Sequence, residues 1–464
     1  MTNLSADTAT IAAISTPPGS GGIGIIRMSG PSSLAVLQAV FSPHKSSCDY
    51  RSHNFFYGTI VDPLEDRIID EVLVVYMRAP KSYTREDVVE IHCHGSFLVL
   101  QNILELLLRY DVQLAEPGEF TKRAFLNGRI DLTRAEAVID ILSAKTRKGV
   151  DLAQEQLAGA LYEQVDQIRK VLTNIRALIE VAIDFPDEDV EIVDRSKHIS
   201  LMEEKVNNPV DHLLRCADQG RIYREGVSVV IVGRPNVGKS SLLNAILQED
   251  RALVTAIPGT TRDTIEEHVD ILGMPVRIAD TAGIRDDADE VEELGIQRAR
   301  KLINQADIVL FMIDGAIGVT EEDTKLFATV SHKPIILLIN KVDLLPDAEK
   351  DEFSFFAAGL SRVYISAKMQ SGLDQLRRTL FSSATGDRGQ WQEDACAPNL
   401  RHKQSLLKAR EASARIVDGL TMGLTSDLVA IDLQECLDHL SDIVGETTTE
   451  DILDVIFEQF CLGK

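Results

Sequence analysis

The segment GRPNVGKS at residues 233–240 decides the fold of the central part of the chain. It matches the pattern G-x-x-x-x-G-K-[ST], in which the backbone N–H groups of a tight, glycine-rich loop surround phosphates. An apolar run precedes this loop and the helix-like segment SLLNAIL follows it, which is the context that a phosphate-binding loop requires. We therefore predict a nucleotide site in which Lys239 reaches the β- and γ-phosphates and Ser240 binds Mg²⁺.

Strand-like and helix-like segments alternate around this loop, from about Gly226 to Ala384. The runs that read as strands are 227–232, 275–279, 307–313, 334–339 and 362–366. Helices between successive strands predict a mostly parallel sheet that is covered on both faces. Upstream, the sequence TRAE at 133–136 reads as a capping box, and it opens a helical stretch with few breakers before Pro186.

Helical patterns on both sides of the alternating region predict an α/β domain that is inserted into a helical domain. A separate α/β domain precedes them, because residues 67–77 and 87–94 have strand character and residues 97–110 have helical spacing. The predicted boundaries are 1–120 for the N-terminal domain, 121–220 and 385–464 for the two parts of the helical domain, and 221–384 for the inserted domain.

Three further motifs follow the phosphate loop in order. DTAG at 280–283 ends a strand, which places Asp280 where a carboxylate holds the Mg²⁺ shell. NKVD at 340–343 ends another strand, and Asp343 can accept hydrogen bonds from both the ring N–H and the exocyclic amine of guanine. Adenine lacks this pair of donors, so the motif selects GTP. SAK at 366–368 is expected to support the base from the opposite side.

The segments that would hydrolyse GTP lie between these motifs. IPGTTRD at 257–263 occupies the expected position of the first switch, where Thr261 would complete the Mg²⁺ coordination. Ras-type enzymes place a water-orienting Gln just after D-x-x-G, but the residue here is Ile284. The acidic run at 285–294 follows; one of its carboxylates could act as a general base, although such a run is also typical of a solvated surface.

These motifs, together with TPPGSGGIGIIRMSG at 16–30, DFPDED at 184–189 and the terminal FCLGK, resemble the tRNA modification GTPase family MnmE (TrmE). The resemblance runs from about residue 10 to Lys464. It implies an N-terminal tetrahydrofolate-binding α/β domain, a central helical domain and a P-loop G domain inserted into the helices. It also implies addition of an aminomethyl or carboxymethylaminomethyl group at C5 of the wobble uridine of certain tRNAs.

The resemblance further implies cofactors and partners. A tetrahydrofolate derivative, in the 5-formyl or 5,10-methylene form, would supply a one-carbon unit, and an FAD-dependent partner, MnmG (GidA), would act in the same reaction. The chain would form a homodimer whose G domains pair, and it would bind K⁺ beside the phosphates where other GTPases use an arginine finger. GTP hydrolysis stimulated by K⁺ and not by Na⁺ is the corresponding expectation.

Individual residues follow from motif matches to the family. The implied K⁺ ligands are Asn236, Thr255, Ile257 through its backbone carbonyl, and Thr260, and the catalytic, water-orienting residue is Glu292. Mg²⁺ is assigned to Ser240 and Thr261. The residues expected to bind GTP are Asn236, Val237, Gly238, Lys239, Ser240, Ser241, Thr255, Ala256, Ile257, Pro258, Gly259, Thr260, Thr261, Asp280, Thr281, Ala282, Gly283, Asn340, Lys341, Asp343, Ser366, Ala367 and Lys368.

The N-terminal region contains two misleading patterns. GSGGIG at 19–24 matches a dinucleotide fingerprint, but a strand-like run follows it rather than a helix, so a glycine-rich turn is the better interpretation. His92 and His94 would share one face of a strand, yet two ligands are too few for zinc, and a structural or substrate-contacting His94 is favoured. The resemblance implies folate contacts at Arg27, Glu90, Arg129 and Lys464.

Cys461 lies four residues from the end of the sequence, in CLGK. Prenylation requires a C-a-a-X ending with aliphatic residues, which this segment lacks. Two interpretations stay open: a buried structural cysteine at the end of a helix, and a functional thiol next to the folate site, which the resemblance favours.

The net charge of −24 argues against a protein that grips nucleic acid alone, because such proteins carry a basic footprint. We expect no DNA binding, and tRNA contact that relies partly on a partner's surface. Six cysteines without a C-x-x-C pair, no apparent signal peptide and no apolar run of membrane-spanning length predict a cytoplasmic protein without a membrane contact. The alternatives are a ribosome-assembly GTPase, which should carry a basic module such as a KH domain, and a scaffold that uses GTP to control dimerisation.

Overall fold

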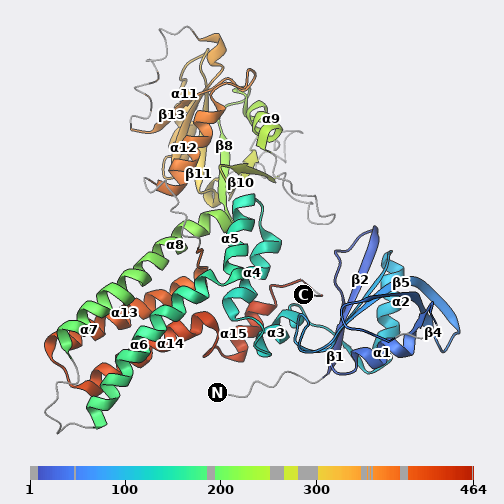
Figure 1. The fold of residues 1–464 in the computed structure, drawn as a ribbon. Coiled ribbons are helices and arrows are strands. Elements are labelled where there is room, and N and C mark those ends of the chain that lie inside the picture. The colour runs from blue at the N-terminus through green and yellow to red at the C-terminus, as the bar shows by residue number, and fades with distance from the viewer. Residues whose placement is uncertain are drawn as a thin grey trace. The chain divides into compact units, whose positions relative to one another are not determined.

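The computed structural model of the chain describes residues 9–45, 49–184, 194–250, 266–280, 301–345, 359–386 and 396–461, with the single residues 353, 356 and 463. The chain divides into two units (Figure 1). The first comprises Met1–Ile139, Tyr162–Ala177 and Leu433–Lys464, and the second comprises Asp140–Leu161 and Leu178–Asp432. Among the described residues, no helix is long and apolar enough to cross a membrane.

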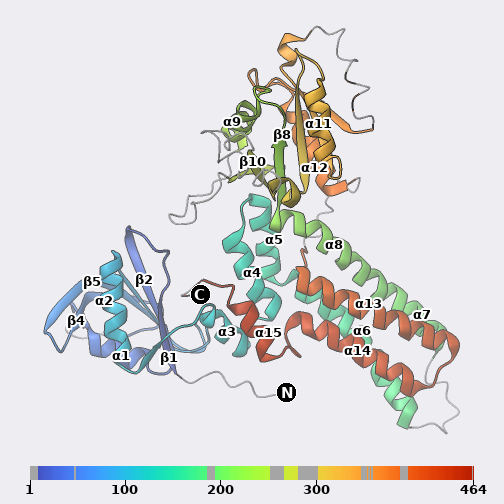
Figure 2. The same ribbon diagram turned by 180° about the vertical axis from the view of Figure 1, so that it is seen from behind.

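A seven-stranded sheet forms the N-terminal part of the first unit, in the order β3-β4-β5-β6-β2-β1-β7. The helices α1 and α2 pack against one face of this sheet. Figure 2 shows the sheet and these two helices from the side opposite to that of Figure 1. The bounds are β1 Thr10–Ile14, β2 Gly21–Ser29, α1 Ser33–Val40, β3 Phe41–Pro43, β4 Phe55–Asp62, β5 Arg67–Met77, β6 Val88–Gly95, α2 Phe97–Leu108 and β7 Val112–Leu114.

Side chains alternate across this sheet, as the pleat of a strand requires. Ile26 and Met28 of β2 and Ile91 of β6 point into the core beneath α1 and α2. Their neighbours Arg27 and Glu90 therefore point to the opposite face, and they lie directly opposite each other in the antiparallel pairing of β2 with β6. The predicted strands at 67–77 and 87–94 and the predicted helix at 97–110 are confirmed by β5, β6 and α2.

Helices make up most of the remainder outside the inserted domain. Their bounds are α3 Glu119–Leu126, α4 Leu132–Ser143, α5 Arg147–Ala158, α6 Ala160–Asp184, α7 Arg195–Met202, a π-helical turn Glu203–Asn207, α8 Asn208–Glu225, α13 Leu400–Met422, α14 Ser426–Val444 and α15 Glu450–Phe457. The helical character predicted for both sides of the inserted domain is confirmed.

One detail of the helical prediction, the capping box at 133–136, is wrong. The first helix begins one residue before Thr133, and Asp131 caps it by accepting the backbone N–H of Arg134 at 3.1 Å. The predicted helical stretch is confirmed, and it consists of three helices, α4, α5 and α6. Thr146 caps the start of α5 by accepting the N–H of Gly149, and Gly159 ends α5 with a left-handed φ of 110°.

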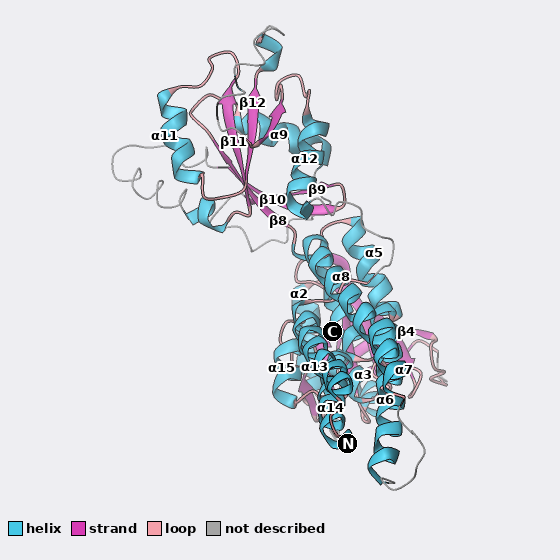
Figure 3. Ribbon diagram, turned by 90° about the vertical axis from the view of Figure 1, so that its left-hand side faces the viewer, coloured by secondary structure: helices cyan, strands magenta, loops and turns pink. Residues whose placement is uncertain are grey.

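The inserted domain contains a six-stranded sheet in the order β13-β12-β11-β8-β10-β9, which Figure 3 shows with helices on both faces. All pairings are parallel except that of β9 with β10, so the predicted mostly parallel sheet is confirmed. The bounds are β8 Val227–Val232, α9 Lys239–Asp250, β9 Glu266–Ile271, β10 Met274–Asp280, β11 Ile308–Asp314, α11 Glu321–Val330, β12 Ile335–Asn340, β13 Ser361–Tyr364 and α12 Leu373–Thr385.

Two cores cover the two faces of this sheet. Leu242 and Ile246 of α9 and Leu376 of α12 pack on one face, and Val330 of α11 packs on the other. Every residue of β11 and β12 is buried, which explains why both strands read as uninterrupted apolar runs.

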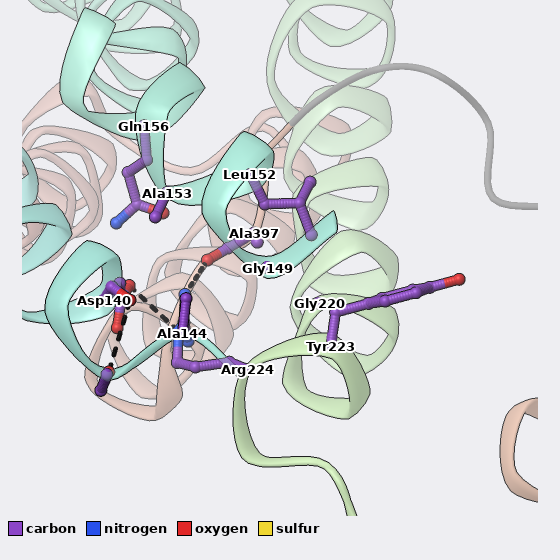
Figure 4. A pocket seen from close by; sticks show the side chains of 11 residues that line it. Asp140, Ala144, Gly149, Leu152, Ala153, Gln156, Gly220, Tyr223, Arg224 and Ala397 are labelled. Atoms are coloured by element: carbon purple, nitrogen blue, oxygen red, sulfur yellow. Dashed lines mark hydrogen bonds and ion pairs between the residues drawn. The ribbon is translucent and has the colours of Figure 1, made fainter. Parts of the chain in front are cut away.

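The inserted domain joins the helices where α8 ends and where the chain returns before α13. Arg224 of α8 forms an ion pair with Asp140 of α4 at 3.0 Å and donates a hydrogen bond to the carbonyl of Ala397 on the returning segment (Figure 4). Gly220 is required beside this contact, because a Cβ there would lie 2.6 Å from Cβ of Ala397. A cavity of about 20 Å³, enough for one water molecule, lies among these residues.

Candidate functional site

The phosphate loop follows β8, and two of its residues have a backbone conformation with positive φ. Asn236 has a left-handed φ of 65° and Gly238 a φ of 105°. A Cβ at position 238 would lie 2.3 Å from Nδ2 of Asn340. Only glycine fits at this position, so the second glycine of the motif is required both by its backbone conformation and by the close approach of Asn340.

The side chain of Lys239 lies across this loop. Its Nζ donates to the backbone carbonyls of Gly233 and Arg234, both at 2.9 Å. Helix α9 begins at Lys239, and Ser240 and Ser241 are exposed in its first turn. The positive end of the helix dipole of α9 therefore lies beside an ammonium group, an arrangement that suits phosphates.

Asn340 joins three of the predicted motifs through one buried side chain. Its Nδ2 donates to the carbonyl of Val237 in the phosphate loop at 2.7 Å, and its Oδ1 accepts the N–H of Ala367 in SAK at 3.0 Å. The carboxyl ends of parallel strands meet at one edge of a sheet, where ligands bind in open α/β folds. The structure thus brings the described parts of GRPNVGKS, NKVD and SAK together at that edge.

Asp314 is a residue of this site that the motifs do not identify. It ends β11, is buried, and accepts a hydrogen bond from Nζ of Lys341 at 2.5 Å. Lys341 has a left-handed φ of 64°, and Asp343 follows in the exposed 3-10 turn Val342–Leu344. A carboxylate at the carboxyl end of an apolar strand was the signal available in the sequence.

Part of the predicted site lies outside the described residues. This part comprises Thr255, Ala256, Ile257, Pro258, Gly259, Thr260, Thr261, Thr281, Ala282, Gly283, Glu292 and Lys464. Asp280 ends β10 opposite Ile231 of β8, which places its backbone one strand from the phosphate loop. The assignments of these residues stay predictions.

A second cluster surrounds Arg27 in the N-terminal sheet. Arg27 forms an ion pair with Glu90, with Nη2 and Oε1 2.8 Å apart, and its guanidinium lies 5.5 Å from the ring centroid of Tyr83 and 5.7 Å from that of Phe120. Arg129 stacks on Tyr83 at 4.7 Å and donates to its carbonyl at 3.0 Å. The sheet and the segment after α3 therefore bring together the described residues that were predicted to contact folate.

The C-terminal segment reaches this cluster. The carbonyl of Gly463 accepts hydrogen bonds from Oγ of Ser15 at 3.1 Å and from Nη1 of Arg27 at 3.2 Å. Cys461, two residues earlier, is exposed, so the interpretation of a buried structural cysteine is wrong. The terminal segment thus carries an exposed thiol two residues before the residue that docks on Arg27.

His94 projects from the same sheet beside a carboxylate. Its Nδ1 lies 2.7 Å from Oδ1 of Asp70, and its backbone N–H donates to Oδ2 of Asp70 at 2.8 Å. Cys93 points to the opposite, buried face, where burial raises the pKa of its thiol to about 11. In the described part of the chain, no cluster of three His, Cys, Asp or Glu residues could hold a metal ion.

The hydrogen bond to Asp70 raises the pKa of His94 above its ordinary value of 6.5. The pair therefore stabilises the fold fully below the pKa of the unfolded chain, and this contribution is lost as pH rises through the higher folded pKa. We expect the Asp70→Asn variant to titrate His94 at a lower pH than the wild type. An NMR titration of the imidazole checks this, with the exposed His53 as the internal control; equal pKa values of His94 in both proteins would contradict it.

Comparisons with known proteins cover almost the whole chain. Two family models match it: the MnmE helical domain over residues 132–461 and the GTP-binding protein TrmE N-terminus over residues 10–129. The tRNA modification GTPase MnmE of Desulfotalea psychrophila is 61% identical over 463 residues and 99% of each chain. That of Carboxydothermus hydrogenoformans is 47% identical over 98% of this chain and 99% of its own. Among solved structures, Era of Aquifex aeolicus with GDP and AlF4⁻ is 28% identical over 40% of this chain and 66% of that chain, with a TM-score of 0.29.

Proposed function

The chain belongs to the MnmE family of tRNA modification GTPases, and on that premise we propose that it modifies C5 of the wobble uridine of certain tRNAs. The family resemblance read from the motifs is confirmed, and with it a role as a GTPase in tRNA modification. This role implies binding of GTP and Mg²⁺. The group added is of the aminomethyl or carboxymethylaminomethyl type. The observation that carries the proposal is the docking of the terminal segment, with its exposed Cys461, on Arg27 beside Glu90.

In the proposed GTP site, backbone N–H groups of the phosphate loop and the Lys239 ammonium bind the phosphates, and Asp343 selects guanine. Mg²⁺ fits the hydroxyl of Ser240, in the first turn of α9, because hard cations prefer oxygen ligands. Thr261 supplies a second hydroxyl in this proposal. A K⁺ ion fits an oxygen ligand such as the side chain of Asn236. This residue is exposed and has a left-handed backbone conformation. Thr255, Ile257 and Thr260 complete the proposed K⁺ set, and Glu292 orients the attacking water.

Potassium dependence gives the sharpest test of this cation site. We expect GTP hydrolysis in KCl to exceed that in NaCl at equal ionic strength by roughly tenfold or more, since a cation beside the phosphates replaces an arginine finger that supplies ~10³-fold or more in other GTPases. The measurement is phosphate release under saturating GTP and Mg²⁺. The Asn236→Ala variant should lose the difference between the two salts, and equal wild-type rates in KCl and NaCl would contradict the assignment.

The Arg27 cluster fits a tetrahydrofolate derivative. The partly exposed ring of Tyr83 offers an apolar surface to a flat ring system, and the guanidinium groups of Arg27 and Arg129 suit the carboxylates of a folate tail. When bound, the folate would supply a one-carbon unit. Arg27 and Glu90 orient the ligand in this proposal, and the terminal segment brings the Cys461 thiol to the same region.

The proposal also includes two protein partners. The net charge of −24 disfavours tRNA binding by this chain alone. In this proposal, an FAD-dependent MnmG-type partner therefore supplies much of the tRNA-binding surface. A second copy of the chain pairs with the first through the G domains. Cycles of GTP hydrolysis would drive this pairing and time the reaction at the folate cluster.

Nucleoside analysis of bulk tRNA from cells that lack this gene tests the proposed function. Mass spectrometry should show loss of the C5 aminomethyl-type uridines, and a plasmid copy of the wild-type gene should restore them. A Lys239→Ala copy should not restore them, because its phosphate site is disabled. An unchanged nucleoside profile in the deletion strain would overturn the proposed modification and favour a ribosome-assembly role.

A further inference from the structure

A buried carboxylate outside all of the nucleotide motifs contacts the phosphate loop. Asp323, in the first turn of α11, is fully buried and accepts a hydrogen bond from Nε of Arg234 at 2.8 Å. Arg234 is the second residue of the phosphate loop, and its side chain is only 14% exposed. We propose that Asp323 and Arg234 are positioning residues for GTP binding and hydrolysis, which together brace the first half of the loop.

Asp323 is itself held rigidly. Its Oδ2 accepts the N–H of Thr320 at 3.0 Å and the hydroxyl of Thr320 at 2.8 Å, and the N–H of Asp323 donates to that hydroxyl. This reciprocal capping box fixes the carboxylate at the N-terminus of α11, where the helix dipole favours negative charge. One oxygen therefore caps the helix, and the other is left for Arg234.

The brace continues into the part of the loop that faces the phosphates. The backbone carbonyl of Arg234 accepts a hydrogen bond from Nζ of Lys239 at 2.9 Å. A chain of hydrogen bonds thus runs from Thr320 through Asp323 and Arg234 to Lys239. This lysine is expected to reach the β- and γ-phosphates. Nη2 of Arg234 is buried and has no hydrogen-bond partner within the described residues. The hydrogen bond from Nε to Asp323 therefore orients the guanidinium group of Arg234.

The loop segment 234–237 is consequently held at both ends by side chains from other elements. Asp323 of α11 holds Arg234, and Asn340 of β12 holds Val237. Between these anchors lie the exposed Pro235 and Asn236, the second with a left-handed φ of 65° that residues other than glycine seldom adopt. Two fixed ends keep this conformation in place, so the loop N–H groups are already oriented when phosphates arrive.

The alternative is that Asp323 merely caps α11 and that Arg234 adds nothing to the loop. The two roles predict different measurements. A helix cap changes the melting temperature and leaves nucleotide affinity alone, whereas a brace of the phosphate loop changes nucleotide affinity at temperatures where the domain is folded.

The Asp323→Asn variant of the full-length chain tests the proposal, which rests on the proposed GTP-binding function. Asparagine keeps an oxygen for Thr320, but its amide N–H₂ would face the guanidinium of Arg234. We expect the dissociation constant of a fluorescent GDP to rise about tenfold or more, as loss of one buried charge-assisted hydrogen bond implies. Glu322→Gln is the matched control: it removes one negative charge from an exposed side chain in the same helix turn and should bind GDP as the wild type does.

Variants of Arg234 test the same interaction from its other side, so the proposal can be tested even if the Asp323 variant misfolds. Arg234→Ala should show the same loss of GDP affinity, and the Arg234→Ala/Asp323→Asn double variant should bind no worse than the weaker single variant, because both remove one interaction. An affinity within twofold of the wild type in both single variants would overturn the brace. Failure of the wild type itself to bind GDP would instead overturn the proposed nucleotide function, so the two failures are distinguishable.

Discussion

Replacing Asn340 with alanine should raise the dissociation constant for GDP by roughly 30-fold or more. The change removes the bond to the carbonyl of Val237 and the bond from the N–H of Ala367, both of them buried. Leaving each buried group without its partner costs ~1–3 kcal/mol. The phosphate loop and SAK would then lose the side chain that joins them.

The two hydrogen bonds can be separated by a second substitution. Asn340→Asp keeps an oxygen for the N–H of Ala367 but has no N–H to donate to Val237, so its affinity for GDP should lie between the wild type and the alanine variant. Asn304→Ala, an exposed position in the same domain, is the matched control and should bind normally. Binding is measured with a fluorescent GDP below the melting temperature of each variant. Normal affinity in Asn340→Ala would show that the loop is positioned without it.

The parts of the inserted domain that the sequence predicts well are those determined by local pattern. The apolar runs at 307–313 and 334–339 became β11 and β12 because a strand covered on both faces must be apolar throughout. The strand β9 was missed. Its sequence EEHVDI alternates the buried Val269 and Ile271 with the polar His268 and Asp270, which is expected for an antiparallel edge strand with one exposed face but resembles a polar loop.

Local signals also mark helix boundaries that the helical periodicity does not resolve. The break between α4 and α5 is encoded by Thr146, an N-cap residue, and the end of α5 by Gly159, which adopts a left-handed conformation. Helical periodicity alone does not locate these boundaries, because it describes the faces of a helix and not its ends.

Contacts across long sequence separations could not be predicted. Arg234 and Asp323 lie 89 residues apart, and Arg27 and Gly463 lie 436 apart. No spacing rule relates such positions, because their contact depends on how the sheets and helices pack. The family resemblance supplied Arg27 and Glu90 as candidates, but the docking of the terminal segment on Arg27 emerged only from the structure.

Replacing Arg27 with alanine should reduce tRNA modification by roughly 100-fold or more while GTP hydrolysis stays within twofold of the wild type. The guanidinium has an ion pair with Glu90, a hydrogen bond to the carbonyl of Gly463 and two ring contacts, all of which are lost. Charge-assisted hydrogen bonds are each worth about 1.5–3 kcal/mol, so losing two of them accounts for the expected factor. The measurement is the fraction of modified uridine in tRNA from a complemented deletion strain, with hydrolysis assayed on purified protein.

Two further variants show whether the expected loss of tRNA modification comes from the geometry or from the charge of the Arg27 side chain. Arg27→Lys retains the positive charge, but a lysine ammonium does not reproduce the planar fork that meets Glu90 and Gly463 together, so modification should be only partly restored. Arg51→Ala removes an arginine whose side chain is 76% exposed and pairs with Asp49, so it should modify tRNA normally. If Arg27→Lys performed as well as the wild type, the site would need only a cation near Glu90. If Arg27→Ala did so, the cluster would not bind the folate, and the terminal segment with Cys461 would have to act without docking on Arg27.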